Sequence, residues 1–292
     1  MSSEYKILNC RNRTIKFGTM PLLMGVVNVT PDSFSDGGKF LVSHDAVARA
    51  LTLLEDGATI IDVGGESTRP GAIPVSIDEE IARTKPVIEK LKKAAPDCLI
   101  SIDTRNAGTA EEAMKAGADI INDISGLGYD GEIASVAAAW NAGLILMHMR
   151  GVPSNMQSPE NLRYQDVIAE VKDFLVNAVE KALAKGVKRD NIVIDPGIGL
   201  FSKDINSNHR LLFEIEKLKE LGLPMLVGPC RKKFIGEVLN IDAPEERLFG
   251  TIGVAVHLAE AEVEILRLHE IKPFREALTM FLWCKHYSGE NK

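Results

Sequence analysis

The sequence predicts an α/β protein with the (β/α)8 fold of a TIM barrel. Short apolar segments rich in β-branched residues recur eight times, and a stretch with helical periodicity follows each of them. The eight units fill roughly 250 residues, which is the usual length of such a barrel. The strand segments are apolar almost throughout, and this pattern indicates strands buried on both faces of a parallel sheet.

The expected strands and helices alternate along the chain. The strands are expected at 22–29, 59–63, 99–103, 119–123, 144–149, 192–196, 224–228 and 264–269. The helices are expected at 43–57, 76–94, 106–117, 131–143, 163–185, 207–222, 245–261 and 273–287. Ser43 and Ser76 are expected to cap the first two helices, and Glu79 completes a capping-box pattern with Ser76.

Residues 1–20 lie outside this alternation. Segments 5–10 and 13–18 flank a polar dipeptide, which predicts a short N-terminal β-hairpin that closes the bottom of the barrel. Residues 21–292 are expected to form a single barrel domain, because no linker rich in Pro or Ser divides them. A doubly wound sheet of the Rossmann type is the rival fold, but no G-x-G-x-x-G turn follows the first strand.

The composition and net charge of the chain limit the classes of partner that it is expected to bind. The chain has 292 residues, of which 45% are hydrophobic, and a formal net charge of −7. Because an acidic chain does not attract nucleic acid or an acidic membrane surface, we expect neither as a partner. Cys10, Cys98, Cys230 and Cys284 form no C-x-x-C pair, which predicts reduced thiols in a cytoplasmic protein. No apolar run reaches the roughly 18 residues that a membrane span needs.

Polar residues stand at the ends of the predicted strands, where barrels of this class build their active sites. They are Asn28, Asp62, Asp103, Asn122, Asp123, His148, Asp195, Arg267 and His269. Such residues often cap the following helix, so about a third or more of them are expected to be structural. The segment MGVVNVTPDSFSDGG (24–38) carries more side-chain oxygens than a plain connection needs, which predicts a loop that holds something polar.

The charged residues near the strand ends form two groups. The cationic group is Arg69, Arg231, Lys232, Lys233, Arg267 and His269, and it predicts an anion site where such barrels often bind phosphate. The second group is Asp62, Asp103, Asn122 and Asp195. Since an unpaired buried charge is costly, these acceptors predict a ligand with an amino group beside a ring N–H, such as guanine or a pterin. For Asp62, a structural role beneath the following turn is an equal alternative.

Eight motifs follow one another at the strand ends. They are MGVVNVTPDSFSDGG, IDVGGESTRPGA, SIDT, INDISG, LMHMRG, DPGIG, GPCRKKFIG and RLH. In this order, over residues 20–282, they resemble the dihydropteroate synthase family, a target of sulfonamides. The resemblance implies a TIM barrel of folate biosynthesis that joins p-aminobenzoate to 6-hydroxymethyl-7,8-dihydropterin diphosphate, with Mg²⁺, and gives dihydropteroate and diphosphate.

The resemblance also implies a role for each matched residue. The pterin would be held by Asp103, Asn122, Met147, Asp195, Gly228 and Lys232. The diphosphate would be held by Asn28, Asp62, Thr68, Arg69, Arg267 and His269, with Asn28 also at Mg²⁺. The p-aminobenzoate side would be shaped by Thr68, Arg69, Pro70, Leu200, Phe201 and Cys230, and closed by the loop that contains Asp36. The catalytic set would be Asp103, Asp195, Lys232 and Arg267.

The sequence departs from the family pattern at two places near the p-aminobenzoate side. The family usually has Ser-Arg-Lys-Ser where this chain has Cys230-Arg231-Lys232-Lys233, so Cys230 is a weaker donor than serine and Lys233 could bind the p-aminobenzoate carboxylate instead. After DPGIG the chain carries one residue more than the family before its lysine, Lys203, so either Leu200 or Phe201 could form the aromatic wall. Both departures concern the affinity for p-aminobenzoate and sulfonamides, and they leave the pterin and diphosphate assignments unchanged.

The difficult chemical step would be the departure of a multiply charged diphosphate, which Mg²⁺ and the Arg/His cluster would stabilise. Because the methylene left behind adjoins an electron-rich ring, we expect a dissociative route. The rival interpretations are a pterin-binding methyltransferase barrel, a Schiff-base aldolase that uses Lys232, and a pterin-binding protein without catalysis. Apolar residues in the last helix, such as Leu282 and Trp283, and the habit of the family predict a homodimer.

Overall fold

The computed structural model describes residues 6–29, 38–67, 71–72 and 74–285, and its centre is a parallel β-barrel. The barrel strands are β3 (Leu22–Asn28), β4 (Ile60–Gly64), β5 (Leu99–Asp103), β6 (Ile120–Asp123), β7 (Gly143–Met147), β8 (Ile192–Asp195), β9 (Leu226–Val227) and β10 (Ile265–Leu268). They form one sheet in the order β8-β7-β6-β5-β4-β3-β10-β9, and every paired neighbour is parallel. The predicted TIM-barrel class is confirmed.

The two outer strands of this order meet, so the sheet closes on itself. Ile194 of β8 and Met225 form a parallel bridge, and the N–H of Ile194 donates to the carbonyl of Pro224 at 3.0 Å. The expected strand at 224–228 is reduced to Leu226–Val227 because Pro224 has no N–H to donate to a ladder. The seam between β8 and β9 is therefore the weakest join of the barrel.

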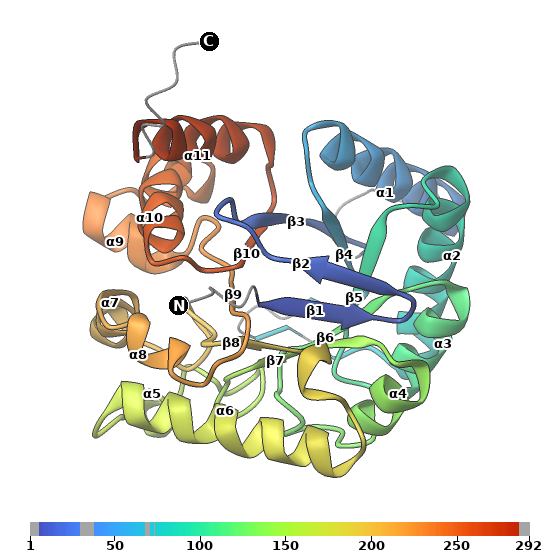
Figure 1. Ribbon diagram of the computed structural model, residues 1–292, viewed down its shortest axis with the longest axis horizontal. Helices are drawn as coiled ribbons and strands as arrows, with labels where there is room; N and C mark the ends of the chain where they lie inside the picture. The colour runs from blue at the N-terminus through green and yellow to red at the C-terminus, as the bar shows by residue number, and fades with distance from the viewer. Residues whose placement is uncertain (1–5, 30–37, 68–70, 73, 286–292) are drawn as a thin grey trace.

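Helices surround the barrel, and the main core lies between them and the outer faces of the strands (Figure 1). They are α1 (Gly38–Glu55), α2 (Ile77–Ala94), α3 (Ala107–Ala116), α4 (Ile133–Trp140), α5 (Pro159–Leu162), α6 (Val167–Ala184), α7 (Ile205–Phe213), α8 (Glu216–Lys219), α9 (Lys233–Leu239), α10 (Leu248–Glu260) and α11 (Lys272–Lys285). Short 3₁₀ turns, η2 (Arg189–Asn191) and η3 (Pro244–Arg247), precede β8 and α10.

The helix boundaries differ from the expected ones at four places. The helix expected at 163–185 begins at Val167, and the short α5 before it was not predicted. The first helix begins at Gly38, so Ser43 is not its cap; the Ser43 hydroxyl instead accepts a hydrogen bond from Lys90 of α2 at 2.7 Å. The helix expected at 207–222 is divided into α7 and α8, and α9 was not predicted. The cap at Ser76 is confirmed, because its side chain accepts from the N–H of Glu79 at 3.2 Å.

The N-terminal hairpin consists of β1 (Ile7–Cys10) and β2 (Arg13–Lys16), and it lies across one end of the barrel (Figure 1). Leu8, Cys10 and Phe17 are buried against one apolar side chain from each of the eight barrel strands. Those strand residues are Met24, Ile60, Leu99, Ile120, Ile145, Val193, Leu226 and Ile265. They stand in the first half of their strands, so the hairpin covers the N-terminal end of the barrel and leaves the other end open to a site.

Replacing Leu8 by Ala is expected to lower the free energy of unfolding by about 2–5 kcal/mol, because the fully buried side chain would leave a cavity. Any activity of a site at the polar strand ends should remain unchanged per folded molecule, since the hairpin lies at the opposite end of the barrel. Urea denaturation measures the first effect, and Lys16→Ala on the exposed face of β2 is the matched control. A loss of stability equal to that of Lys16→Ala would contradict the covering role of the hairpin.

Two further features bear on the environment of the protein. In the parts of the chain that the structure describes, no helix is both long enough and apolar enough to cross a membrane. All four cysteines are free thiols; Cys10 and Cys98 are buried, whereas Cys284 is exposed.

Candidate active site

The side chains of the candidate site share the inner face of the barrel with the residues that pack on the hairpin. Side chains two or four residues apart along a strand point to the same side of a sheet. Counting two or four residues on from the apolar floor gives Asn28, Asp62, Asp103, Asn122, Met147, Asp195, Gly228 and Arg267. The strand register places Asp103 beside both Gly64 and Asn122, so these positions form one ring at the C-terminal end of the barrel.

Arg267 is the centre of this ring. Its Nε donates to Asp62 Oδ2 and its Nη2 donates to Asp103 Oδ2, each at 2.6 Å. Asn122 Nδ2 donates to the same Asp62 oxygen at 3.1 Å. Asp62 is fully buried, whereas 22% of the Arg267 side chain is exposed, so the guanidinium covers one carboxylate and reaches the solvent side. The acidic group and the cationic group expected from the sequence are thus joined through Arg267.

The charges of this ring determine the protonation of Asp103. Burial raises the pKa of the Asp103 carboxyl to about 7, the Arg267 guanidinium opposes this rise, and the charge of Asp62 adds to it. The two carboxylates in turn raise the pKa of Arg267 despite its burial, so the guanidinium stays charged. The second oxygen of Asp62, Oδ1, is buried without a hydrogen-bond partner among the described residues. Asp103 therefore changes its charge near neutral pH, within the range where an enzyme works.

Asp195 and Lys232 are a second pair of ionisable residues, on the other side of the barrel mouth. Asp195 is 5% exposed, and its Oδ1 accepts the N–H of Gly197 at 2.7 Å. Burial raises the pKa of Asp195 to about 6, against the lowering effects of that hydrogen bond and of Lys232. Burial and the nearby Arg267 lower the pKa of Lys232 to about 8, although Asp195 opposes them.

The structure distinguishes the two candidates for an aromatic wall. The ring of Phe201 lies below Lys232, with Nζ 4.7 Å from the ring centroid. The same ring packs on a small apolar cluster of Ile124, Met147, Met149 and Met156. Phe201 rather than Leu200 therefore faces the ring of polar residues. The additional residue in this loop is accommodated by Ser202, whose φ of +56° lies in the left-handed region.

Three candidate residues lie at the edge of the mouth. Asn28 is exposed at the last position of β3, next to Gly64 in the neighbouring strand. His269 is exposed one residue after β10, and its carbonyl accepts from Arg49 at 2.5 Å. Cys230 is partly buried, which raises the pKa of its thiol, and the thiol is hydrogen-bonded to the backbone of His269. Thr68, Arg69, Pro70 and Asp36 lie outside the described residues.

Other polar residues near the strand ends have structural partners. Asp123 points away from the barrel interior and accepts the N–H groups of Ser125 and Leu127, as an ordinary turn residue does. Arg231 pairs with Glu270 at 2.5 Å, and Lys233 pairs with Glu237 on the exposed face of α9. Of the strand-end residues, Asp123 thus has the contacts of a structural residue, and Arg231 and Lys233 of the cationic group each have a carboxylate partner.

Sequence reasoning missed two pairs of buried polar side chains that support the site. Arg105 donates two 3.0 Å hydrogen bonds to Glu66, which also accepts the N–H of Val75, so this pair holds the base of the second loop. Lys203 is almost completely buried and contacts His148 Nδ1 at 2.8 Å. The signal available for Glu66 was its place in the ESTRPG motif, whereas nothing in the sequence indicated its partner.

The described residues are compatible with Mg²⁺ as an ion that arrives with a substrate. Among these residues, no three His, Cys, Asp or Glu side chains stand close enough together to hold a metal. Asn28 offers one exposed amide oxygen, which is a hard ligand. Because Mg²⁺ commonly keeps several waters and binds through one or two protein oxygens and substrate phosphates, a single Asn28 is compatible with it.

The fold and the site define an α/β-barrel enzyme of the pterin-binding class. The family model described as "Pterin binding enzyme" matches residues 24–269, which include every barrel strand except the first two residues of β3. The ring of buried acceptors at the C-terminal end of the barrel lies within that match.

Comparison with known relatives then identifies the family within this class. The dihydropteroate synthase of Synechocystis sp. is 45% identical over 256 residues, which cover 88% of this chain and 87% of the relative. The solved structure of Xanthomonas albilineans dihydropteroate synthase with 4-aminobenzoic acid has a TM-score of 0.88 and 37% identity, with 97% and 99% of the two chains covered. The same enzyme in complex with 7,8-dihydropteroate has a TM-score of 0.84 and 35% identity, with 96% and 99% covered. The chain belongs to the dihydropteroate synthase family, and it is a transferase of folate biosynthesis.

Proposed function

We propose that the ring at the barrel mouth binds the pterin diphosphate and p-aminobenzoate and forms 7,8-dihydropteroate. The observation that carries this assignment is the contact of one guanidinium, Arg267, with two buried carboxylates, Asp62 and Asp103, in an interior lined by further acceptors. A flat ring with several N–H donors and an anionic tail satisfies both kinds of group at once.

The pterin side is assigned to the deeper residues. Asp103, Asn122 and Asp195 are each less than 10% exposed, so they present acceptors in a nearly dry interior where hydrogen bonds discriminate strongly. Lys232 is the donor for the ring carbonyl, and Met147 and Gly228 provide apolar surface beside it. A Cβ at position 228 would make only an ordinary contact, 3.8 Å from Arg267 Cβ, so Gly228 contributes by leaving its backbone open to a ligand.

The anionic side is assigned to the residues nearer the solvent. Arg267 and His269 would bind the diphosphate, with Asn28 at its edge, and Thr68 and Arg69 would complete the group. Asp62 holds the Arg267 guanidinium from below, which favours the structural alternative for this residue. When bound with the substrate, Mg²⁺ would neutralise phosphate charge, and Asn28 would hold it.

In the proposed reaction, the bond between the pterin methylene and the diphosphate oxygen breaks, and the electron pair leaves with the diphosphate. The amine nitrogen of p-aminobenzoate forms the new C–N bond and then releases a proton to solvent. Arg267 stabilises the charge that develops on the leaving group, and the carboxylates of Asp103 and Asp195 stabilise positive charge on the pterin. The site therefore needs no covalent intermediate, and the order of the two bond changes is dissociative.

The p-aminobenzoate side is assigned to the loops after β4, β8 and β9. Phe201 forms its aromatic wall beneath Lys232, with Leu200 at its edge, and Cys230 takes the place of the usual serine. Thr68, Arg69, Pro70 and Asp36, which lie outside the described residues, are assigned to this side from the resemblance to the family alone. Lys233 is bound to Glu237 on the exposed face of α9, so it is not assigned to the carboxylate of this substrate.

The direct test is a mixture of the protein, Mg²⁺, the pterin diphosphate and p-aminobenzoate. We expect equal amounts of dihydropteroate and diphosphate, measured by chromatography. The family assignment sets aside the methyltransferase, aldolase and non-catalytic interpretations of the sequence, and this assay separates them again, because only the synthase releases diphosphate together with a pterin–amine product. Absence of both products above the protein-free control would refute the proposed function.

The pH dependence of kcat/KM for the pterin substrate should be bell-shaped. Asp103 and Asp195 must be ionised to accept N–H groups, and burial raises their pKa values to about 7 and about 6, so activity should fall as the pH drops through that range. Lys232 must be protonated to donate, and its pKa is lowered to about 8, so activity should also fall above that pH. Lys232→Met should remove the alkaline limb and keep the acid limb. A flat profile between about pH 5 and pH 9 would contradict the assignment.

We further propose that the protein is a cytoplasmic homodimer with two structural parts, a hairpin over residues 1–20 and a single pterin-binding barrel over residues 21–292. Free thiols at all four cysteines suit a reducing compartment.

Large apolar side chains are exposed on the last helices, namely Val238, Leu239, Phe249, Met280 and Trp283. A groove of about 500 Å³ between α7, α9 and α10 adjoins this surface. Sedimentation of the protein and of Phe249→Asp tests the dimer.

A further inference from the structure

A second cluster of charged side chains lies directly outside the barrel wall, next to the aromatic side of the site. Asp195, Met147 and Arg267 point into the barrel, whereas His148 has the opposite parity and points outward. There its ring stacks edge-on against Phe174 of α6, with 4.8 Å between the centroids. Lys203, from the loop after β8, fills the space beside it and is 1% exposed.

Lys203 makes two contacts in this position. Its Nζ lies 2.8 Å from His148 Nδ1 and donates to the carbonyl of Phe201 at 2.8 Å. A lysine nitrogen has N–H groups for both contacts in either protonation state, so it can donate to His148 when Nδ1 of the ring is unprotonated. Burial lowers the pKa of both residues well below their usual values. The charge of Asp195 opposes this lowering of the pKa for Lys203, but in the part of the chain that the structure describes no carboxylate forms an ion pair with Lys203.

Such a lysine is unfavourable for the folded protein by itself. A buried ammonium without a carboxylate partner costs free energy, and so does the loss of its proton at neutral pH. An apolar side chain of similar shape would avoid both costs. The presence of a lysine here thus calls for a role other than stability.

The contacts of the loop identify that role. Ser202 Oγ accepts the N–H of Arg150, Tyr164 donates to the Ser202 carbonyl at 3.0 Å, and Asn208 accepts the N–H of Gly199. These bonds fix the loop on both sides of Phe201, and Lys203 fixes the carbonyl of Phe201 itself. Because the Phe201 ring lies 4.7 Å from Lys232 Nζ, a shift of this carbonyl would displace the ring from Lys232.

We propose that Lys203 and His148 are positioning residues that hold Phe201 against Lys232 and so set the affinity for the aryl amine substrate. This inference rests on the proposed function, because it takes Phe201 as the wall of the p-aminobenzoate side. The tether also explains how the loop accommodates its additional residue: Ser202 adopts a left-handed conformation, and the Lys203 side chain returns to the barrel wall.

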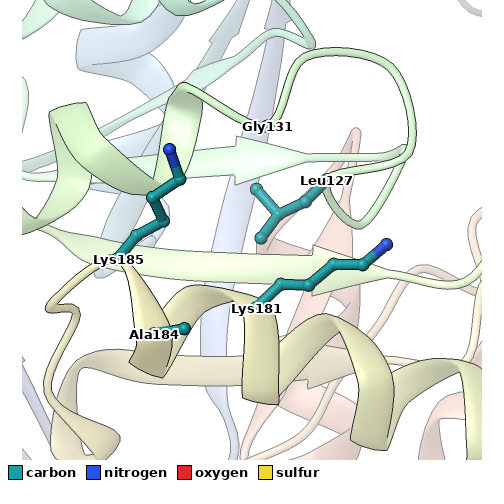
Figure 2. Close-up of a pocket in the computed structure, with 5 residues that line it drawn as sticks. All are labelled: Leu127, Gly131, Lys181, Ala184 and Lys185. Atoms are coloured by element: carbon teal, nitrogen blue, oxygen red, sulfur yellow. The ribbon is translucent and has the colours of Figure 1, made fainter.

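A surface pocket between α6 and the loop after β6 lies away from the site, and one of its lysines serves as the control position for Lys203. It has a volume of about 260 Å³ and is lined by Leu127, Gly131, Lys181, Ala184 and Lys185, none of which belongs to the site (Figure 2). Lys181 is exposed on α6, so Lys181→Met removes a lysine charge at a position that the inference does not involve.

The test compares Lys203→Met with Lys181→Met in steady-state kinetics and thermal unfolding. For Lys203→Met we expect the KM for p-aminobenzoate to rise about tenfold, whereas the KM for the pterin diphosphate stays within about twofold. The unfolding temperature should stay equal or rise. Unchanged KM values, or equal increases of both KM values together with lost stability, would overturn the inference. A wild-type protein without turnover would instead refute the proposed function.

If Lys203→Met does not fold, two further comparisons between variants test the same inference. His148→Asn keeps an acceptor near the position of Nδ1, whereas His148→Leu removes it, so only the leucine variant should raise the KM for p-aminobenzoate. Equal values in the two variants would overturn the inference. Phe201→Leu should raise the same KM, and adding His148→Leu to it should give no further increase, because His148 acts through Phe201. If the two substitutions raised the KM for p-aminobenzoate additively, His148 would not act through Phe201.

Discussion

Arg267→Met should abolish synthase activity and lower the stability of the protein at the same time. The variant leaves Asp62 and Asp103 as neighbouring buried carboxylates without their shared counter-ion. Breaking a buried ion pair from one side commonly costs about 3–5 kcal/mol of stability. Removing the group that stabilises the leaving diphosphate should lower kcat by about a thousandfold or more. Urea denaturation and single-turnover release of diphosphate measure the two effects.

A double variant separates these two effects. Asp62→Asn added to Arg267→Met removes one of the two orphaned charges and should recover much of the lost stability, whereas the activity should stay lost. The matched control is Arg189→Met, because Arg189 is an exposed arginine of η2 that precedes β8, at the end of the strand opposite to Asp195 and the ring. If the double variant regained activity together with stability, Arg267 would be a structural residue and the assignment of the anionic side would be wrong.

Asp195→Asn should lower kcat/KM for the pterin diphosphate by about a hundredfold to a thousandfold. The ionised carboxylate accepts N–H groups, whereas an amide presents one acceptor and one misplaced donor in a buried site. Asp195 makes no hydrogen bond with Arg267, so the anionic side should keep its geometry. Calorimetry with a pterin fragment that lacks the diphosphate should show the loss, whereas diphosphate binding should change little.

The same substitution should increase stability at neutral pH. Burial raises the pKa of Asp195 from an ordinary value of 3.8 to about 6. The folded wild type therefore holds a proton between these values that the unfolded chain has released, and its stability falls as the pH rises from about 4 to about 6. Asp195→Asn avoids this loss, a difference on the order of 2 to 3 kcal/mol above pH 6. Asp190→Asn on the surface is the control, and equal curves for the two variants would contradict the burial of the charge.

Most of the fold could be predicted from the sequence because the barrel strands carry their own signal. Continuous apolar runs such as Leu99–Asp103 define strands buried on both faces, and the structure begins and ends β5 at the same residues. Predictions failed where local propensity and tertiary context compete. The first helix begins before its best capping residue, Ser43, and α9 is a short helix held by burial of Phe234 and Ile235 rather than by a strong periodic pattern.

The residues that form the site could largely be predicted from the sequence, whereas the contacts between them could be predicted less well. Parity along the strands and the motifs brought Asp103, Asn122 and Asp195 to the interior, as the structure shows. The pairing of Arg267 with two carboxylates joins strands 205 and 164 residues apart in sequence, so no local pattern could indicate it. The Lys203–His148 contact was equally hidden, because an apolar environment was not expected for a lysine in a loop.

The shared inner face of the strands limits where this chain can gain or lose residues. The side chain that seals the floor and the side chain that meets the ligand are spaced by two or four along the same strand, as Ile265 and Arg267 are. One inserted residue within a strand would turn both outward together, so the closure and the chemistry would fail in a single step. Changes in length must therefore collect in the loops beyond the last inward residue. The segment after Asp195 is such a place, because it lies beyond the last inward residue of β8.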